Sequence, residues 1–136
     1  MALKLKQYNS NEQYIEKLYL EHFGKKLKPE KSDIIYGFYS DNKLVGYIIY
    51  LLIDKKTCKI DWVFAPGFGK ELMKRIESKL KKSGINKILL NVSIDPNESK
   101  PTVMKRLNFY ISLGYKVFDI KYRKDYGPLL SMSKDL

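Results

Sequence analysis

Three strand-like segments follow one another in the first half of the chain with no helical pattern between them. Residues 34–40 and 44–53 are rich in β-branched and aromatic side chains, and residues 58–64 continue the same pattern. Residues 41–43, with the sequence Asp-Asn-Lys, and residues 54–57 separate these segments, and both connections are short enough to be hairpin turns. The sequence therefore predicts an antiparallel meander, and any fold proposed for the chain must contain it.

After the meander the hydrophobic period changes from that of strands to that of helices. A break at residues 65–69 precedes apolar residues spaced three and four apart, which predict a helix over residues 70–83. Residues 87–94 then form an almost wholly apolar strand, as expected for a sheet that is buried on both faces. A further helix begins near Pro101 and stops at Gly114.

The order of the predicted elements defines the fold class. A strand at residues 3–8 and a helix that ends at Gly24 precede the meander, and strands at residues 115–122 and 128–134 follow the last helix. The complete order is β-α-βββ-α-β-α-ββ. It predicts one α/β (α+β) domain over residues 1–136, with a mixed central sheet of about seven strands and helices on both faces.

Composition excludes several classes of protein. The only cysteine, Cys58, can form neither an internal disulfide nor a thiolate metal cluster, so we expect a reducing compartment and a cytoplasmic location. The only histidine, His22, excludes histidine-based triads and multi-histidine metal sites, and we expect no metal. The longest apolar stretch, residues 47–53, is far shorter than the roughly 20 residues of a membrane helix. We therefore expect no membrane partner.

Basic residues outnumber acidic residues by a wide margin. The 26 lysines and arginines and the 15 aspartates and glutamates give a formal charge of +11. Such a surface attracts polyanions, which include nucleic acid, anionic lipid and phosphate-bearing cofactors. The lysines are scattered along the chain rather than gathered in one arm, so most of the charge is expected on a solvated surface. Charge alone therefore does not identify a ligand.

The break between the meander and the next helix is a candidate phosphate site. Strand 58–64 leads to Gly67-Phe68-Gly69, and the helix starts at once with Lys70. Glycines let the backbone approach a ligand, and the first amides of a helix, at the positive end of its dipole, favour phosphate. The alternative is that the Pro-Gly-x-Gly sequence is only a tight turn between a strand and a helix.

Tyr110 marks a second candidate site. It lies four residues before Gly114, on the last turn of the predicted helix, from which its hydroxyl can reach a cleft beside the neighbouring strand. The alternative is that Tyr110 and Phe109 are aromatic residues of the core. Periodicity alone leaves both interpretations open.

Together these features resemble the GNAT superfamily of acyl-CoA-dependent N-acetyltransferases. The order of elements matches over nearly the whole chain, and the helix–turn signature of the family is matched by Phe109-Tyr110 followed by Gly114-Tyr115. The chain also finishes in Met-Ser-Lys-Asp-Leu, which is similar to the end of the family's last strand.

The phosphate loop departs from the pattern of this family. Residues 64–66 (Phe-Ala-Pro) match its opening and residues 67–69 (Gly-Phe-Gly) match its end, but the intervening residues, which include an Arg or Gln, are missing. A shorter loop offers fewer amides to a pyrophosphate, and Pro66 offers none. The alternative to an enzyme is a catalytically inactive GNAT-like module that binds nucleic acid or protein through its basic surface.

The resemblance implies direct transfer of an acetyl group from acetyl-CoA to an amine of a small molecule or protein. In that interpretation Tyr110 protonates the departing thiolate, and Asp61 accepts the proton of the amine. The residues that would bind acetyl-CoA are Trp62, Val63, Phe64, Gly67, Phe68, Gly69 and Lys70. The implied partners are acetyl-CoA and an amine acceptor, nucleic acid is a less favoured ligand, and the protein is expected to be a monomer or a homodimer.

Overall fold

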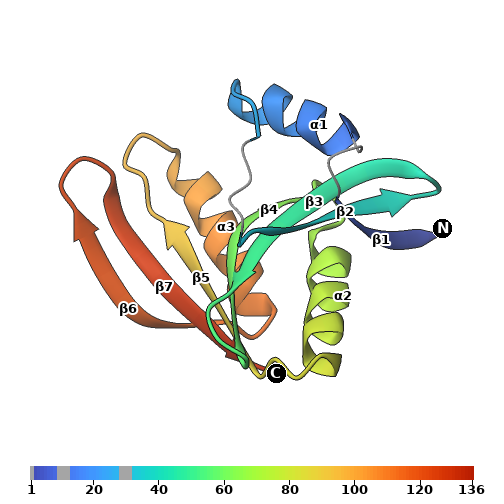
Figure 1. Ribbon diagram of the computed structural model, residues 1–136. Helices are drawn as coiled ribbons and strands as arrows, with labels where there is room; N and C mark the ends of the chain where they lie inside the picture. The colour runs from blue at the N-terminus through green and yellow to red at the C-terminus, as the bar shows by residue number, and fades with distance from the viewer. Residues whose placement is uncertain (1, 9–12, 28–31) are drawn as a thin grey trace.

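The computed structural model describes residues 2–8, 13–27 and 32–136 (Figure 1). In these residues the chain forms seven strands and three helices in the predicted order, with small shifts at the boundaries. The elements are β1 (Leu3–Gln7), α1 (Gln13–Phe23), β2 (Ile34–Ser40), β3 (Lys43–Leu52), β4 (Thr57–Phe64), α2 (Gly69–Lys82), β5 (Lys87–Ser93), α3 (Lys100–Ser112), β6 (Lys116–Arg123) and β7 (Gly127–Asp135).

All the strands belong to one mixed sheet in the order β1-β2-β3-β4-β5-β7-β6. Neighbouring strands are antiparallel except for β4 and β5, which run parallel. The hairpin between β2 and β3 closes through Asp41 and Asn42, both of which have positive φ, and Ser40 pairs directly with Lys43. Two residues of this conformation are what a type I′ turn requires, and aspartate and asparagine tolerate it well. The turn residues therefore set the register of this hairpin.

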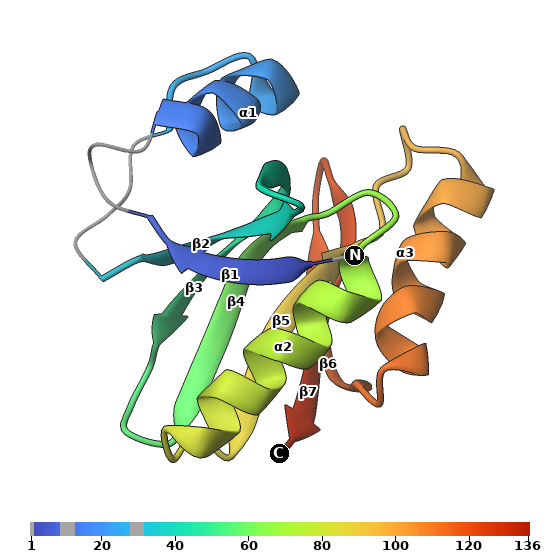
Figure 2. The same ribbon diagram turned by 90° about the vertical axis from the view of Figure 1, so that its right-hand side faces the viewer.

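Helices cover both faces of the sheet, as predicted. On one face α2 buries Leu72, Met73 and Ile76 completely among apolar side chains of the sheet. α3 lies beside α2 on the same face (Figure 2). α1 packs on the opposite face, where Ile15 is buried in a smaller cluster with Tyr47. The larger core therefore lies between the sheet and the pair α2 and α3.

Strand β5 is buried on one face only, which corrects the expectation of burial on both. Ile88, Leu90 and Val92 are buried in the larger core, whereas Asn91 on the alternate face is exposed. α1 packs on β2 and β3, so no helix in the described part of the chain covers the opposite face of β5. The apolar run at residues 88–90 suggested two buried faces, and the polar Asn91 was the signal against it.

Local signals bound α3. The Ser99 hydroxyl accepts a hydrogen bond from the Thr102 amide at the start of the helix, and Pro101 lies in the first turn, where a missing amide costs no hydrogen bond. Gly114 has a φ of 95° and follows the last turn. These ends determine the length of α3 and place Tyr110 on its last turn.

Candidate active site

The parallel pair β4 and β5 diverges in the middle of the sheet. Its ladder joins residues 57–60 to residues 87–90 and then ends. Beyond this point β4 stays paired with β3 as far as Phe64, and β5 stays paired with β7 as far as Ser93. Two cavities, of about 670 and 640 Å³, lie at the divergence. The residues that line both of them are Val63, Phe64, Arg106 and Tyr110. The two cavities therefore adjoin each other and together make up the cleft.

A β-bulge in β4 lies at the start of this cleft. The register between β3 and β4 skips Asp61, which is therefore the extra residue. After the bulge, Val63 packs against the core on the α2 side, and Phe64 packs against the cluster on the α1 side. Bulges beside functional sites redirect side chains, and here the bulge presents Asp61 and Trp62 to the second cavity.

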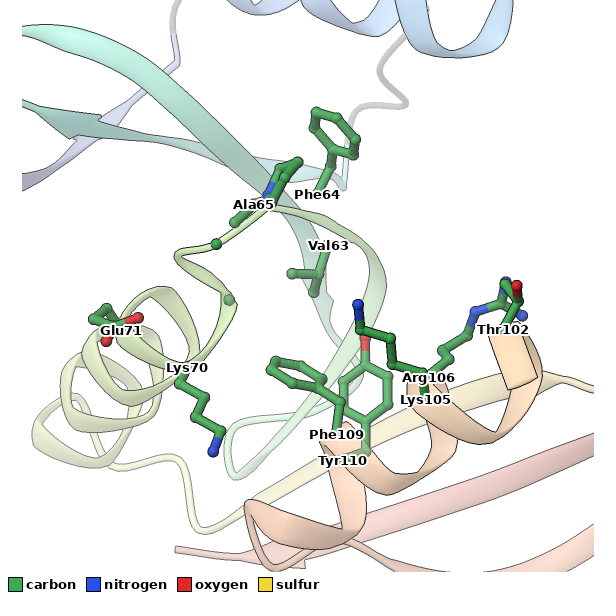
Figure 3. A pocket seen from close by; sticks show the side chains of 13 residues that line it. Val63, Phe64, Ala65, Lys70, Glu71, Thr102, Lys105, Arg106, Phe109 and Tyr110 are labelled. Carbon is green, nitrogen blue, oxygen red and sulfur yellow. The ribbon is translucent and has the colours of Figure 1, made fainter.

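The first cavity lies against the start of α2 (Figure 3). Gly67, with a φ of 78°, turns the chain towards the helix, and no described side chain caps the helix N-terminus. The first-turn residues Gly69 and Lys70 line the cavity. At this end of a helix, main-chain amides and the helix dipole favour a negatively charged ligand. The predicted phosphate site therefore coincides with a real cavity.

The charged side chains around the first cavity are mainly positive. Lys70 from α2 and Lys105 and Arg106 from α3 line it, together with one carboxylate, Glu71. Figure 3 shows that the α2 and α3 residues approach the cavity from two different helices. The excess of cations adds to the helix N-terminus, so this side of the cleft suits a phosphate-bearing ligand.

Phe68 differs from its neighbours in the loop because it does not line the first cavity, and its side chain packs against the core instead. Its ring packs edge-on against Phe38 at a centroid distance of 6.3 Å, and its amide donates to the Ala65 carbonyl at 2.9 Å. Gly69 allows α2 to approach α3 closely, because it has no side chain at the point of contact. A methyl group at this position would lie 2.9 Å from the Phe109 ring of α3. The loop therefore holds α2 against both the sheet and α3.

Tyr110 lies where the two cavities meet. Its ring packs edge-on against Phe109 and Tyr115, at centroid distances of 5.0 and 5.9 Å. Burial raises the pKa of the Tyr110 hydroxyl above its usual value, and the charge of Arg106 acts in the opposite direction. The hydroxyl therefore keeps its proton at neutral pH and can donate it to a developing anion. Figure 3 shows Tyr110 projecting from α3 towards Val63.

Arg106 connects the end of β5 to the loop before α3. Its guanidinium donates to the Ser93 carbonyl at 3.1 Å and to both carboxylate oxygens of Glu98. The hydrogen bonds with Glu98 raise the pKa of Arg106. Neither residue was predicted from the sequence, because the two meet only through tertiary structure. The position of Arg106, one turn before Tyr110 on the same helix, was the available signal.

The second cavity contains two carboxylates. Asp61 of β4 and Glu98 line it, and Trp62 and Asn91 line its walls on either side of the divergence. Arg106 pairs with Glu98, and Asp61 contributes the second negative charge. An aromatic face and a carboxylate attract cations, so this side of the cleft suits a ligand of the opposite charge to the first.

The structure divides the site residues expected from the sequence between the two cavities. Those at the first cavity are Gly67, Gly69 and Lys70, those at the second are Asp61 and Trp62, and those at both are Val63, Phe64 and Tyr110. Phe68 alone among them lines neither cavity, and its ring packs against Phe38 in the core.

In the described residues, no group of His, Cys, Asp and Glu side chains is arranged to hold a metal ion. None of the described helices has the length and apolar character needed to cross a membrane. Cys58 is fully buried, and burial raises the pKa of its thiol to about 12, so the thiol is not a reactive group. The side chain of His22 lies outside the described residues.

Comparisons with known proteins point to a single family. The family model described as the acetyltransferase (GNAT) family matches residues 3–115. An uncharacterized N-acetyltransferase of Acanthamoeba polyphaga mimivirus is 32% identical over 114 residues, which cover 79% of this chain and 27% of that protein. The chain therefore spans about a quarter of the length of this relative.

Several solved structures share the fold over nearly the whole chain. A GNAT family acetyltransferase from Elizabethkingia anophelis with acetyl-CoA bound has a TM-score of 0.72 and 13% identity, over 98% of both chains. The aminoglycoside 6'-N-acetyltransferase from Enterococcus faecium has a TM-score of 0.75 and 13% identity, over 97% of this chain and 96% of that one. The ribosomal-protein-S18-alanine N-acetyltransferase from Escherichia coli has a TM-score of 0.74 and 12% identity, over 98% and 94%. At these identities the likeness establishes the fold.

Proposed function

The chain belongs to the acetyltransferase (GNAT) family, and on that basis we propose that it transfers an acetyl group from acetyl-CoA to an amine of a small molecule or protein. The observation that carries the proposal is the cleft between β4 and β5, whose two cavities share Val63 and Tyr110. A donor bound in one cavity and an acceptor bound in the other would meet beside a group able to protonate the leaving thiolate. Direct transfer within a ternary complex needs this arrangement.

Acetyl-CoA binds in the first cavity. Its pyrophosphate lies at the start of α2, near the amide of Gly69 and the side chains of Lys70 and Lys105. The pantetheine arm follows β4 beyond Ile60, where the ladder with β5 has ended, and it bonds to the main chain as an added strand would. The acetyl-CoA bound in the Elizabethkingia anophelis structure supports this choice of donor.

The acceptor enters the second cavity as an ammonium ion. Asp61 and Trp62 line that cavity and favour a cation. Because a protonated amine is not a nucleophile, it must lose a proton before it attacks, and Asp61 accepts that proton directly or through water. The carboxylates of this cavity therefore favour an amine acceptor over an alcohol.

The chemical step forms an amide bond and breaks a thioester. The amine nitrogen attacks the thioester carbonyl carbon, a main-chain amide of β4 stabilises the developing oxyanion, and the C–S bond then breaks. Tyr110 gives its proton to the CoA thiolate, and burial holds its pKa high enough for it to be protonated when the thiolate forms. The nitrogen loses its second proton to solvent as the amide forms. The proton held by Asp61 also leaves to solvent, from which Tyr110 is reprotonated. The products are the N-acetylated acceptor and CoA.

Calorimetry with acetyl-CoA, followed by a thiol-release assay with a panel of primary amines, tests this proposal. Wild type and Tyr110→Phe should bind acetyl-CoA equally well, whereas turnover in the variant should fall by about 10²-fold or more. Tyr126→Phe is the matched control, because this tyrosine is 65% exposed and lines neither cavity. A wild-type protein that does not bind acetyl-CoA would contradict the donor site, and full turnover in Tyr110→Phe would contradict the acid role.

A further inference from the structure

A separate cavity, of about 750 Å³, lies between the second half of α2 and the strands β1, β2 and β3. Figure 2 looks onto α2 with these strands beside it. The strands contribute Leu5, Tyr36 and Tyr50 to the walls, and the cavity shares no lining residue with the two cavities of the cleft. Its volume is within the range of roughly 300–1,000 Å³ that is usual for small-molecule sites.

The charged side chains that line this cavity are all cations. Arg75, Lys79 and Lys82 lie on one face of α2, at spacings of four and three residues. No carboxylate lines the cavity, and none of the three cations forms an ion pair within the described part of the chain. Like charges at these spacings destabilise a helix. An anion bound among them would remove this repulsion.

The C-terminal end of α2 does not account for all of this charge. Three lysines occupy the last turn, where the helix dipole is equivalent to about half a negative charge. The amide and the hydroxyl of Ser83 both donate to the Leu80 carbonyl, so this end of the helix is also capped. Arg75 lies about two turns before that end, where the effect of the dipole has faded. The positive charge at the cavity therefore exceeds what the helix needs.

Tyr50 supplies a neutral donor to the same cavity. The residue is 3% exposed, and its hydroxyl has no hydrogen-bond partner among the residues that the structure describes. Burial raises the pKa of this hydroxyl, so it keeps its proton. The Tyr36 ring lies parallel to the Tyr50 ring at a centroid distance of 6.2 Å, and Lys79 places its ammonium 5.2 Å from the centre of the Tyr36 ring. An acceptor on a ligand would satisfy the Tyr50 hydroxyl, which the fold leaves without a partner.

We propose that this cavity binds a small phosphate monoester whose organic part is apolar or aromatic. Arg75 and Lys79 contact the phosphate oxygens, and the Tyr50 hydroxyl donates to one of them. A phosphate dianion suits three cations better than a carboxylate does, and the guanidinium fork matches two of its oxygens. The organic part lies against Leu5 and Leu80. Because the cavity has no residue in common with the cleft, the site is independent of the proposed acetyl transfer.

Amide chemical shifts in heteronuclear NMR, recorded during a titration with phenyl phosphate at about 0.15 M salt, test the site. We expect a dissociation constant below about 1 mM, with the largest shifts at residues 75–83 rather than at residues 67–70 of the first cavity. Phenol lacks the phosphate and inorganic phosphate lacks the ring, so each should bind about tenfold more weakly or worse. No binding of phenyl phosphate, or shifts confined to residues 67–70, would overturn the proposal. Inorganic phosphate that binds as tightly as phenyl phosphate would overturn the assigned ligand class.

Charge-removing variants separate this site from a general attraction to the basic surface. Arg75→Gln and Lys79→Gln should each weaken the binding of phenyl phosphate by about tenfold. Lys81→Gln is the matched control, because it removes the same charge from the last turn of α2 but lies outside the cavity. It should change the dissociation constant by less than about twofold. Equal losses for Lys79→Gln and Lys81→Gln would show that only net charge attracts the phosphate.

Tyr50→Phe tests the hydroxyl alone. It should weaken the binding of phenyl phosphate by about threefold or more, since one hydrogen bond to the ligand is lost. The free energy of unfolding, measured with urea, should not fall, because the hydroxyl has no partner in the described part of the fold. Unchanged binding together with a lower free energy of unfolding would show that the hydroxyl serves the fold and not a ligand.

Discussion

At the scale of single residues, the short loop before α2 offers few free main-chain amides to the pyrophosphate of the proposed donor. Pro66 has no amide hydrogen, and the Phe68 amide is already bonded to the Ala65 carbonyl. The amides that remain for a pyrophosphate are therefore mainly those of the first helical turn. Lys70, which is exposed and lines the first cavity, is the side chain best placed to compensate.

Lys70→Ala should lower kcat/KM for acetyl-CoA by about 3–10-fold, since a charged hydrogen bond from an exposed lysine is worth roughly 1 kcal/mol. S-acetylpantetheine lacks the pyrophosphate, so the variant should use it as well as wild type does. Lys74→Ala is the control, because Lys74 lies one turn further along α2 and outside both cavities. A loss that is equal for the two donors would show that Lys70 does not bind the pyrophosphate.

Glu77 is a buried acid that joins three parts of the fold. Its carboxylate accepts from Lys134 of β7 at 2.7 Å and from the hydroxyl of Tyr115, after α3, at 2.8 Å. Glu77 is 9% exposed and Tyr115 is 2% exposed, so neither group is well solvated. Because the Tyr115 ring also packs on Tyr110, this small network supports the side of the cleft formed by α3.

Glu77→Ala should lower the free energy of unfolding by about 2–4 kcal/mol, because it leaves the Lys134 ammonium and the buried Tyr115 hydroxyl without their acceptor. Glu77→Gln keeps an acceptor for Tyr115 and should lose less. Glu71→Ala removes an exposed carboxylate from the same helix and should change the free energy by less than about 1 kcal/mol. Urea unfolding measures all three, and similar losses for the two alanine variants would argue against the network.

At the scale of elements, the sequence predicts what depends on near neighbours. The order of strands and helices follows from hydrophobic period, and the turn at Asp41 and Asn42 follows from residues that tolerate positive φ. The bulge at Asp61, the place of β7 between β5 and β6, and the contact of Arg106 with Glu98 depend on segments distant in sequence. Periodicity does not encode such contacts. Some residues that line the cavities, such as Val63 and Tyr110, were named from the sequence, whereas the division of the lining residues between two adjoining cavities was not.

Gly46 shows how closely β3 approaches the loop that leads to α2. A methyl group at this position would lie 2.4 Å from the Phe64 carbonyl oxygen and 2.6 Å from the Ala65 Cβ. These atoms belong to the chain as it leaves β4, so they cannot move aside by rotation of a side chain. The absence of a Cβ at residue 46 therefore allows the end of β4, and with it the wall of the cleft, to lie where it does.

Gly46→Ala should lower the free energy of unfolding by about 2–3 kcal/mol, because the methyl group must displace main chain. It should also weaken acetyl-CoA binding, since the displaced residues lead into the first cavity. Gly69→Ala is the matched control for stability, because its methyl group would meet only the end of the Phe109 ring, which can turn away, and it should cost less than about 1 kcal/mol. Equal losses in thermal or urea unfolding would contradict this difference.

At the scale of the whole molecule, the core contains several groups that ionise only in alkaline solution. Cys58, Tyr47, Tyr50 and Tyr115 are at most 3% exposed. Burial raises the pKa of the Cys58 thiol to about 12, and it also raises the pKa of each of these three tyrosines. In an unfolded chain cysteine titrates near pH 8.5–9 and tyrosine near about 10. The folded protein therefore keeps protons that the unfolded chain loses at high pH.

The free energy of unfolding should stay constant from pH 7 to about 8.5 and fall above it. A raised pKa contributes stability that is complete below the unfolded value and is lost as pH rises towards the folded value. Above about pH 9 the unfolded state binds fewer protons than the folded state, so each such group lowers the free energy by about 1.4 kcal/mol per pH unit. Cys58 should start the decline, and the tyrosines should steepen it above about pH 10.

Urea unfolding at intervals of half a pH unit measures how the free energy of unfolding depends on pH. Cys58→Ala should remove the first part of the decline and keep the second, whereas a free energy that is constant to about pH 11 would show that the core does not hold these protons.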